Sequence, residues 1–389
     1  MTSEHKRILR AIKQEDVIEY AKALIKIPSN TGQEEDIARV LADLMSQIGM
    51  KDVKSDDMWN VYGRIKGAGR KRSILLASHT DTGPAGSMAD AYEPKIMNGS
   101  LFGKHGDVIR GRGAISAKGH IAAALAMAKA LIDSGATPEC DLIIAGYARD
   151  LLGNHDGIRG LLEHEDVRPG LALISEPVNN RILVGARGRV EFDVELEGKQ
   201  VHAGTPEGAI NPIYKMAKFL NVVQKVRLPS HDKLGNATLS PIGVECKVNR
   251  PNIPYVASAT FDRRTIPGES PQTVMRDITE LCEDIRKIDS DFKHRSALRK
   301  AMFAFEVSLD DPLVTLMQEA GQIALNRKLE IAYSRSFSSD AGFLQSLRIP
   351  SAGFGPGRIE DMAEEHVEVK ELMDAARVYA TLGFLHSAR

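Results

Sequence analysis

The sequence of 389 residues lacks the features of several specialised classes of protein. Its three cysteines, Cys140, Cys246 and Cys282, lie far apart and form no CxxC pair, which argues against a disulfide framework or zinc knuckle and favours a reducing compartment. No segment has the roughly 18 apolar residues that a membrane helix needs, and the first residues contain no apolar signal-peptide core. These absences predict a soluble cytoplasmic protein with no membrane partner.

Neither sign of charge dominates, because 51 Lys and Arg residues balance 52 Asp and Glu residues to a net charge of -1. No overall field attracts nucleic acid, so we expect no nucleic-acid partner. Internal repeats and low-complexity tracts are also missing. With 43% hydrophobic residues, the chain is expected to fold into two or three domains, or one large α/β domain with an insertion.

Three short apolar runs, residues 73–77, 142–145 and 171–174, indicate strands that are buried on both faces of a mostly parallel sheet. An Ala- and Leu-rich stretch from Gly119 to Gly135 between two of them predicts a helix. The pattern is typical of an α/β fold.

Residues 14–48 show helical spacing in two blocks with a polar break between them. Ser29, Asn30 and Thr31 lie in that break and are candidate caps of the second helix. These helices are expected to serve as scaffold.

Polar side chains follow each apolar run. His79 and Asp81 follow the first run, Asp150 follows the second, and Glu176 follows the third. In open α/β sheets, ligands bind beyond the carboxyl ends of the strands. We therefore expect these four side chains to share one crevice.

The pattern changes near residue 184. Residues 190–197 alternate apolar and acidic side chains, which predicts an antiparallel strand with one solvated face. The α+β unit that begins there ends near the charged stretch 289–300. We predict an inserted domain at 184–303, between the two parts of the α/β domain at 1–183 and 304–389.

Seven short motifs occur in a fixed order along almost the whole chain. They are His79-Thr80-Asp81, Gly111-Arg112-Gly113-Ala114 with Lys118-Gly119, Glu176-Pro177, Gly198-Lys199 before His202, Asp262 with Arg264, Ser339-Asp340-Ala341, and Gly355-Pro356-Gly357. Together they resemble the M20 family of metallopeptidases and amidohydrolases, which includes succinyl-diaminopimelate desuccinylase. The resemblance implies a zinc-peptidase-like catalytic domain interrupted by a ferredoxin-like lid that forms homodimers. It also implies hydrolysis of an amide bond.

The metal site departs from the family's pattern, in which two zinc ions share about five His or carboxylate ligands. His79 matches the first ligand, Asp81 matches its orienting residue, and Glu176 matches an acidic ligand. Ser116, however, replaces the bridging aspartate, and Leu151 replaces another ligand. A neutral hydroxyl cannot hold two dications together, so we expect no binuclear zinc centre.

Two alternatives stay open for the metal. The first is a site without metal. The second is one divalent ion, such as zinc, held by His79 and Glu176 together with Asp361, His120 or His155. The alternative interpretation of His120 and His155 is that they are solvated loop residues. Asp361 stands where the C-terminal histidine ligand is expected, and His366 is its possible substitute.

Two further residues have competing interpretations. Asp150 matches the general base of the family, and its alternative role is to cap the following segment. Ser116 fills the place of a lost ligand, and its alternative role is that of a nucleophile near a helix N-terminus, with an adjacent base.

The substrate side of the pattern is retained. By resemblance, His202 donates to the oxyanion in the partner's site, while Asn252 and Arg264 hold a substrate carboxylate. Ser339 and Gly355 match the carboxylate cradle of the catalytic domain. The alternative for Arg264 is an ion pair with the aspartate two residues before it.

The sequence therefore predicts a divergent hydrolase that acts on an amide or related C–N bond of a small carboxylate-bearing substrate. Asp150 would activate water, with a pKa raised by burial. Two alternatives are a non-catalytic ligand-binding protein and a metal-independent lyase or isomerase that uses His79 and Asp150 as an acid–base pair.

Overall fold

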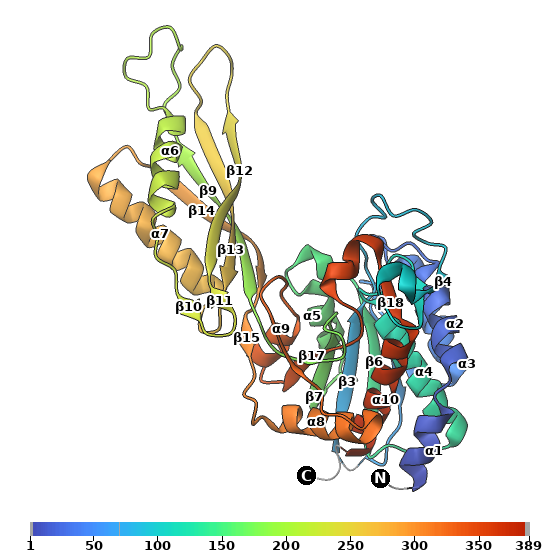
Figure 1. Ribbon diagram of the computed structural model, residues 1–389. Coiled ribbons are helices and arrows are strands. Elements are labelled where there is room, and N and C mark those ends of the chain that lie inside the picture. Colours follow the sequence, from blue (N-terminus) through green and yellow to red (C-terminus); the bar gives the residue numbers. More distant parts are fainter. Residues whose placement is uncertain (1–2, 70, 386–389) are drawn as a thin grey trace. The chain divides into compact units, whose positions relative to one another are not determined.

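The computed structural model describes residues 3–69 and 71–385, which form two compact units (Figure 1). The smaller unit contains Ala186–Phe305 together with the short segment Ser334–Ser338. The larger unit contains the chain up to Gly185 and the remaining C-terminal parts. The sequence did not anticipate that Ser334–Ser338 packs with the inserted unit.

The larger unit is built on one sheet with a parallel centre. The central strands are β3 (Lys71–His79), β6 (Cys140–Tyr147), β7 (Leu171–Ser175) and β17 (Ser351–Phe354), and each neighbouring pair among them is parallel. The first three contain the apolar runs from which buried strands were predicted, and their central residues are buried. The parallel centre brings three polar strand ends to one edge of the sheet.

The margins of this sheet are antiparallel. Within the described residues the sheet has nine strands, in the order β1-β2-β6-β3-β7-β17-β8-β15, with β16 paired to β8. The marginal strands are β1 (Lys51–Ser55), β2 (Val61–Ile65), β8 (Ile182–Ala186), β15 (Phe305–Glu306) and β16 (Ile331–Ser334). The sheet is thus mixed, because β2 and β8 run antiparallel to the central strands next to them.

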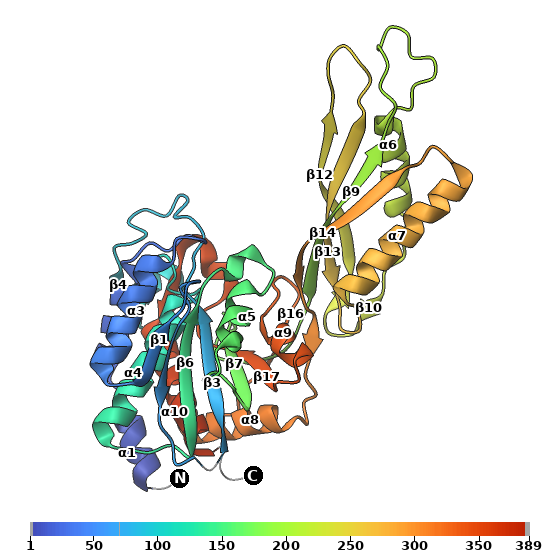
Figure 2. The same ribbon diagram turned by 180° about the vertical axis from the view of Figure 1, so that it is seen from behind.

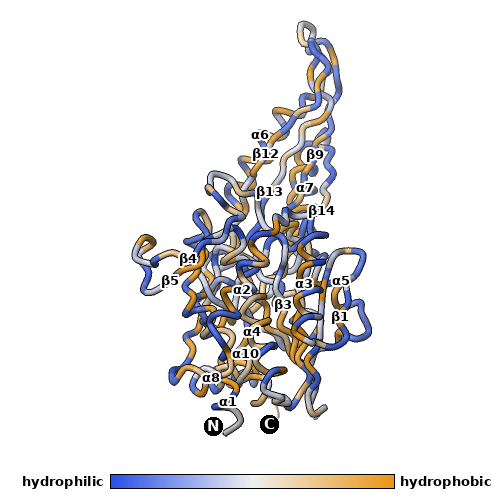
Figure 3. Tube along the Cα trace, turned by 90° about the vertical axis from the view of Figure 1, so that its right-hand side faces the viewer, coloured by the Kyte–Doolittle hydropathy of each residue, from blue (hydrophilic) through white to orange (hydrophobic). Residues whose placement is uncertain are grey.

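Helices cover the sheet (Figure 2). The central one is α4 (Lys118–Ser134), which packs against α2 (Gln14–Ile25) and α10 (Val369–Leu385) and is buried along most of its length. It ends at Gly135, whose φ of 64° is in the left-handed region that favours glycine. Figure 3 shows hydrophobic residues along α4 and α10. The other helices are α1 (Ser3–Ala11), α3 (Glu35–Ile48), α5 (Asp156–Glu163), α8 (Pro312–Leu325) and α9 (Ala341–Ser346).

Shorter elements complete the larger unit. They are the small sheet of β4 (Lys95–Asn98), β5 (Asp107–Arg110) and β18 (His366–Glu368), and the 3-10 helices η1 (Gly99–Phe102), η2 (Asp150–Leu152) and η3 (Ile359–Glu364). None of the helices in the described part of the chain combines the length and apolar composition required to cross a membrane.

The predicted caps of α3 were wrong. The N-cap is Glu34, which makes no capping bond through its side chain. Ser29 instead donates to the carbonyl oxygen of Thr80 at 2.7 Å, and Thr31 donates to Oδ2 of Asp81 at 2.8 Å. The polar break therefore braces the end of β3, where the candidate site lies.

The smaller unit is a two-layer α+β domain. Its antiparallel sheet has the order β12-β13-β9-β14, and its elements follow the ferredoxin-like sequence β-α-β-β-α-β. These elements are β9 (Gly188–Glu197), α6 (Pro212–Val223), β12 (Thr238–Lys247), β13 (Val256–Thr265), α7 (Pro271–Ile288) and β14 (His294–Met302), with a small ribbon of β10 (Ser230–His231) and β11 (Gly235–Asn236).

This domain has its own core. Phe192 on β9 stacks on Phe261 at 5.2 Å between ring centroids, and Phe219 on α6 meets Phe261 edge-on at 5.8 Å. The alternation predicted for β9 is confirmed, because its apolar side chains face this core. The charged stretch near the expected end of the unit forms the edge strand β14 (His294–Met302), and charged side chains suit an edge.

Candidate active site

His79 lies buried at the carboxyl end of β3 and links two other candidate residues. Its Nδ1 is 2.8 Å from the carbonyl oxygen of Asp81 and 3.2 Å from Oδ1 of the same residue. A carbonyl oxygen only accepts, so Nδ1 carries a hydrogen. Its Nε2 is 2.8 Å from Oγ of Ser116. The structure therefore joins Ser116, His79 and Asp81 in one hydrogen-bonded chain.

Asp81 is fully buried and holds the start of the next loop. Its carboxylate accepts hydrogen bonds from the backbone amides of Asp150 at 3.1 Å and Leu151 at 3.0 Å. Burial alone would raise the pKa of Asp81, but the hydrogen bond and charge of His79, with those donors, lower it below the usual range. Asp81 thus remains ionised and fixes both His79 and the segment that carries Asp150.

Glu365 positions Ser116. Its Oε2 accepts from the backbone amides of Gly113 at 2.9 Å, Ile115 at 3.1 Å and Ser116 at 3.4 Å. Lys118, two residues further on, donates instead to the carbonyl oxygen of Ile27. The group beside the Ser116 hydroxyl is therefore His79 rather than Lys118. The sequence did not predict this role of Glu365.

A second acidic group lies on the other side of Asp150. Asp340 is buried, and its Oδ1 is 2.5 Å from Nδ1 of His155, whose ring stacks on Phe343. The hydroxyl of Tyr147 lies 3.4 Å from Oδ1 of Asp150. The prediction that His155 is a solvated loop residue was wrong, because it is buried between Asp340 and Phe343.

His120 is buried too, so the prediction of a solvated loop residue was also wrong for it. A Cβ atom at Gly355 would come within 2.3 Å of the His120 ring. This close contact explains why residue 355 has no side chain. Ser339, predicted beside Gly355 in the cradle, is buried, and its Oγ accepts from the amide of Ala341 at 3.2 Å.

The site contains several titratable groups with shifted pKa values. Loss of water raises the pKa of Asp150 well above its usual range; the charge of His79 opposes this, and that of Asp340 adds to it. Burial also raises the pKa of Glu176. Burial would lower the pKa of His79, but the charges of Asp150, Asp81 and Glu176 outweigh it and raise the pKa to about 10. His79 is therefore an imidazolium at neutral pH.

These contacts do not fit a paired-zinc centre. Nε2 of His79, the atom that would bind a metal, faces the Ser116 hydroxyl, and the Leu151 residue is 47% exposed. Asp361 pairs with Lys104 at 2.5 Å, and His366 stacks on Phe102. Across residues 3–69 and 71–385, no three His, Cys, Asp or Glu side chains gather as a metal site. A single ion held by His79 and Glu176 with Asp361 stays a prediction.

Asp150 is the first residue of η2 and does not cap α5, whose N-cap is His155. The alternative role of Asp150 as a cap of the following segment is wrong, because the N-cap of η2 is Arg149 and that of α5 is His155. Its carboxyl faces His79, Asp340 and the hydroxyl of Tyr147.

The predicted substrate residues of the small domain lie at opposite ends of one strand. His202 is exposed and forms a backbone bridge with Asn252, just before β13 begins. Arg264 lies near the other end of β13, about 26 Å from the strand's first residue, Val256, at 3.3 Å per residue. Its Nε donates to Oδ1 of Asp262 at 2.8 Å. One copy of the domain therefore cannot bring Asn252 and Arg264 to the same carboxylate.

A family model matches part of the chain. The family model described as the M20 peptidase dimerisation domain matches residues 184–290. A succinyl-diaminopimelate desuccinylase of Phenylobacterium zucineum is 25% identical over 389 residues, covering 94% of this chain and 97% of that protein. The chain is similar to M20 metallopeptidases and amidohydrolases. The family comprises hydrolases that act on C–N bonds.

Two further proteins are similar to this chain, one over part of its length and one in its fold. The uncharacterized protein YgeY of Escherichia coli is 27% identical over 277 residues, which cover 69% of this chain and 66% of that protein, just under two thirds of its length. The solved structure of the dipeptidase Dug1p from Saccharomyces cerevisiae has a TM-score of 0.75 at 15% identity, with both chains fully covered. At that identity the likeness concerns the fold. The similarity in fold extends over both units of the present chain.

Proposed function

We propose that this protein hydrolyses an amide or related C–N bond of a small carboxylate-bearing substrate without a binuclear zinc centre. Similarity to M20 hydrolases supports the reaction class, and the desuccinylase name of the Phenylobacterium relative suggests an N-acyl substrate. The observation that carries the proposal is the chain from Asp81 through His79 to Ser116, with the desolvated carboxyl of Asp150 beside it.

In this proposal Asp150 is the general base. Its carboxylate takes a proton from water, and the water oxygen attacks the carbonyl carbon of the substrate. The developing oxyanion accepts a hydrogen bond from the Ser116 hydroxyl, whose oxygen accepts in turn from Nε2–H of His79. Asp150 then returns its proton to the leaving nitrogen as the C–N bond breaks.

The positive charge of His79 offsets the negative charge of the carboxyl groups around it. Three carboxyl groups act on it, from Asp81, Asp150 and Glu176. In the family, two metal ions supply the positive charge at such a cluster; here an imidazolium supplies it. No step of the proposed reaction requires a metal.

The short contact between His79 and Ser116 favours a second route to the same products. If His79 loses its Nε2 proton, it can take the proton of Ser116, whose Oγ then attacks the carbonyl carbon to give an acyl-enzyme. The pKa of about 10 for His79 favours the first route at neutral pH. Mass spectrometry of the protein during turnover separates the two, since only the second adds an acyl group to Ser116.

We propose that the active unit is a homodimer formed through the small domain. The matched dimerisation domain supports this, and so does the separation of Asn252 from Arg264 along β13. A second copy would supply His202 and Asn252 to a site whose own chain supplies Arg264. Sedimentation analysis and mixing of singly inactive variants at these positions would test the assembly.

The decisive experiment offers purified protein a panel of N-acyl amino acids in water enriched in oxygen-18, with elemental analysis before and after chelation. We expect turnover that survives chelation, with one heavy oxygen in the released acid. Loss of turnover on chelation would contradict the metal-free reaction. Thermal stabilisation by ligands without turnover would indicate a binding protein, and a product that gains no water would indicate a lyase or isomerase.

A further inference from the structure

Side chains hold the backbone of the segment that follows β6. Four successive amides in it donate to side-chain oxygens of residues far away in the sequence. The donors are the amides of Ala148, Arg149, Asp150 and Leu151, and the acceptors in that order are Oδ1 of Asn60 at 2.9 Å, Oε1 of Glu34 at 3.1 Å, and Oδ1 and Oδ2 of Asp81 at 3.1 and 3.0 Å. The proposed base Asp150 thus lies in a segment that three fully buried side chains fix in place.

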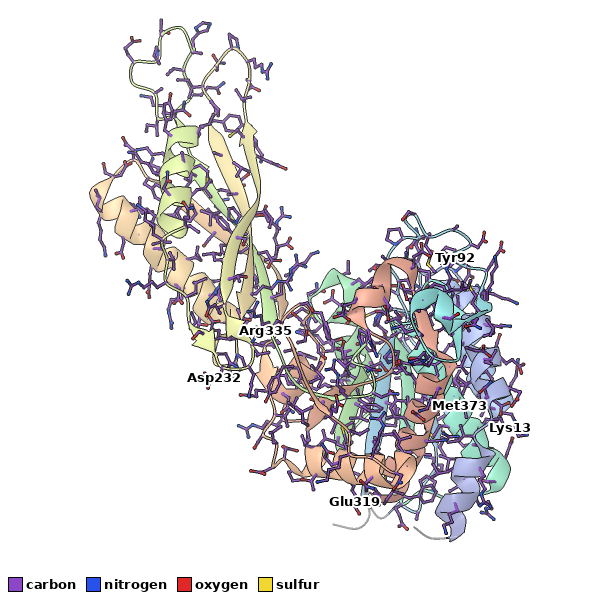
Figure 4. All side chains as sticks on the ribbon, in the orientation of Figure 1. Lys13, Tyr92, Asp232, Glu319, Arg335 and Met373 are labelled. Carbon is purple, nitrogen blue, oxygen red and sulfur yellow. The ribbon has the colours of Figure 1, made fainter. Side chains whose placement is uncertain are left out.

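Glu34 reaches this segment from the loop before α3. Its Oε1 accepts from the amide of Gly32 at 2.9 Å and from that of Arg149, which lies 115 residues further along the chain. Figure 4 shows the side chains and labels Lys13, the N-cap residue of α2, the helix that leads into this loop. Glu34 therefore ties the loop directly to the residue before Asp150.

The helix that follows does not explain the carboxylate of Glu34. Although Glu34 is the N-cap residue of α3, its side chain makes no capping bond. The residue is fully buried, and its second oxygen, Oε2, has no hydrogen-bond partner among the described residues. Burial of a carboxylate is unfavourable unless its hydrogen bonds compensate for the loss of water. In Glu34 that compensation comes through Oε1, from the two amides that it holds.

Arg149 needs such support because its backbone conformation is unusual. Its φ of 62° and ψ of 25° lie in the left-handed region, which residues other than glycine, asparagine and aspartate rarely adopt. Without Glu34 the amide of Arg149 loses its partner, and nothing opposes relaxation of the turn toward a negative φ. Such a change would turn the side chain of Asp150 out of its place beside His79.

We propose that Glu34 is a positioning residue for Asp150 and that it acts through the backbone of Arg149. The inference rests on the hydrolase function proposed above, in which Asp150 takes a proton from water. Because Glu34 holds the preceding amide rather than the substrate, its loss should lower kcat and leave KM nearly unchanged. The role requires an acceptor oxygen at the position of Oε1, which glutamine retains and methionine, of similar length, does not.

Steady-state kinetics on the full chain, with a substrate from the N-acyl amino acid panel, tests the proposal. We expect Glu34→Met to lower kcat about a hundredfold, as for a small displacement of a reacting group, and Glu34→Gln to restore most of it. Glu35→Met changes the exposed neighbouring residue and should leave kcat and KM unaltered. In an Arg149→Gly background, Glu34→Met should cost only about tenfold, because glycine adopts the positive φ without support.

Hydrogen exchange measured by mass spectrometry on the same proteins does not depend on turnover. We expect Glu34→Met to speed exchange in the peptide that covers residues 148–151, whereas Glu34→Gln and Glu35→Met should exchange like the wild type. If Glu34→Met does not fold, Arg149→Val takes its place, since a β-branched residue strongly disfavours a positive φ. This variant should also lower kcat with little change in KM.

A wild-type kcat in Glu34→Met, an equal loss in Glu34→Gln, or unchanged exchange in Glu34→Met would each overturn the proposal. Full kcat in Arg149→Val would overturn it as well. A wild-type protein that turns over no member of the panel would reject the proposed function. Faster exchange in Glu34→Met that Glu34→Gln reverses would then still uphold Glu34 as the residue that positions this segment.

Discussion

The larger unit gathers an excess of acidic groups at its candidate site, whereas the smaller unit holds two arginines without an acidic partner. In the first, Asp81, Asp150, Glu176 and Asp340 crowd around His79 and His155, and burial raises the pKa of two of these carboxyls. In the second, Arg187 and Arg335 share the turn between β10 and β11, and neither pairs with a carboxylate of the described residues. The two units therefore differ in the sign of the charge that their neighbouring side chains leave uncompensated.

The strongest test of the acidic unit is Asp150→Asn. An amide cannot accept the proton of water, so we expect turnover to fall by about a hundredfold to ten-thousandfold, the usual contribution of a general base. The matched control, Asp156→Asn, changes a partly exposed residue of α5 and should retain turnover. Full turnover in Asp150→Asn would exclude this residue as the base.

The same variant should be more stable than the wild type. Because the pKa of Asp150 is raised in the folded protein, its contribution to stability is fully present below the pKa of an unfolded aspartate and is lost as the pH rises through the folded pKa. Asparagine carries no such charge. We expect a Tm higher by a few degrees at pH 8 and no gain at pH 3, measured by calorimetry.

The smaller unit should depend on its own core. Phe261→Ala removes the ring that contacts Phe192 and Phe219, and we expect a loss of about 3–5 kcal/mol in urea unfolding. Leu298→Ala on the exposed edge strand serves as the control, with little change. An equally small effect at Phe261 would contradict an independent core in this unit.

Ser116→Ala tests whether the Ser116 hydroxyl stabilises the oxyanion or only fills the place of a lost metal ligand. Loss of one such donor typically costs about a hundredfold or more in kcat, with KM little changed. Ser134→Ala, at the far end of α4, should leave kcat unchanged. A variant at position 116 with normal kcat would show that the hydroxyl only fills space.

The smallest effect is expected from restoring metal ligands. Ser116→Asp combined with Leu151→Glu returns two carboxylates to positions where the family carries them, and we expect zinc content to rise from little or none to about one ion per chain. Elemental analysis after dialysis measures it. Two zinc ions per chain in the wild-type protein would contradict the prediction that it has no binuclear zinc centre.

Much of the fold was readable from sequence. The apolar runs that became β3, β6 and β7, and the helix ended by Gly135, follow directly from local composition, since buried parallel strands need continuous apolar residues. Strand β14 was missed, because a charged edge strand resembles a loop in sequence. The segment Ser334–Ser338 could not be assigned either, since its packing with a distant domain depends on long-range contacts.

The candidate site was predicted in part. His79, Asp81 and Asp150 were found because they follow buried strands, and the structure places them in contact. His155 was dismissed, since nothing in its neighbourhood signals that it meets Asp340, 185 residues away. Arg187 and Arg335 were not singled out, because their proximity appears only when the chain returns to the small domain.

The amino-acid sequence by itself determined which chemical groups are present, that serine and leucine replace metal ligands, and where buried strands and helices form, since these depend on side-chain type and local periodicity. Tertiary structure alone decided that Ser116 meets His79, that Asp150 loses water, and that two arginines share one turn. Hydrogen bonds and charges act over a few ångströms, so their consequences appear only when distant segments are brought together.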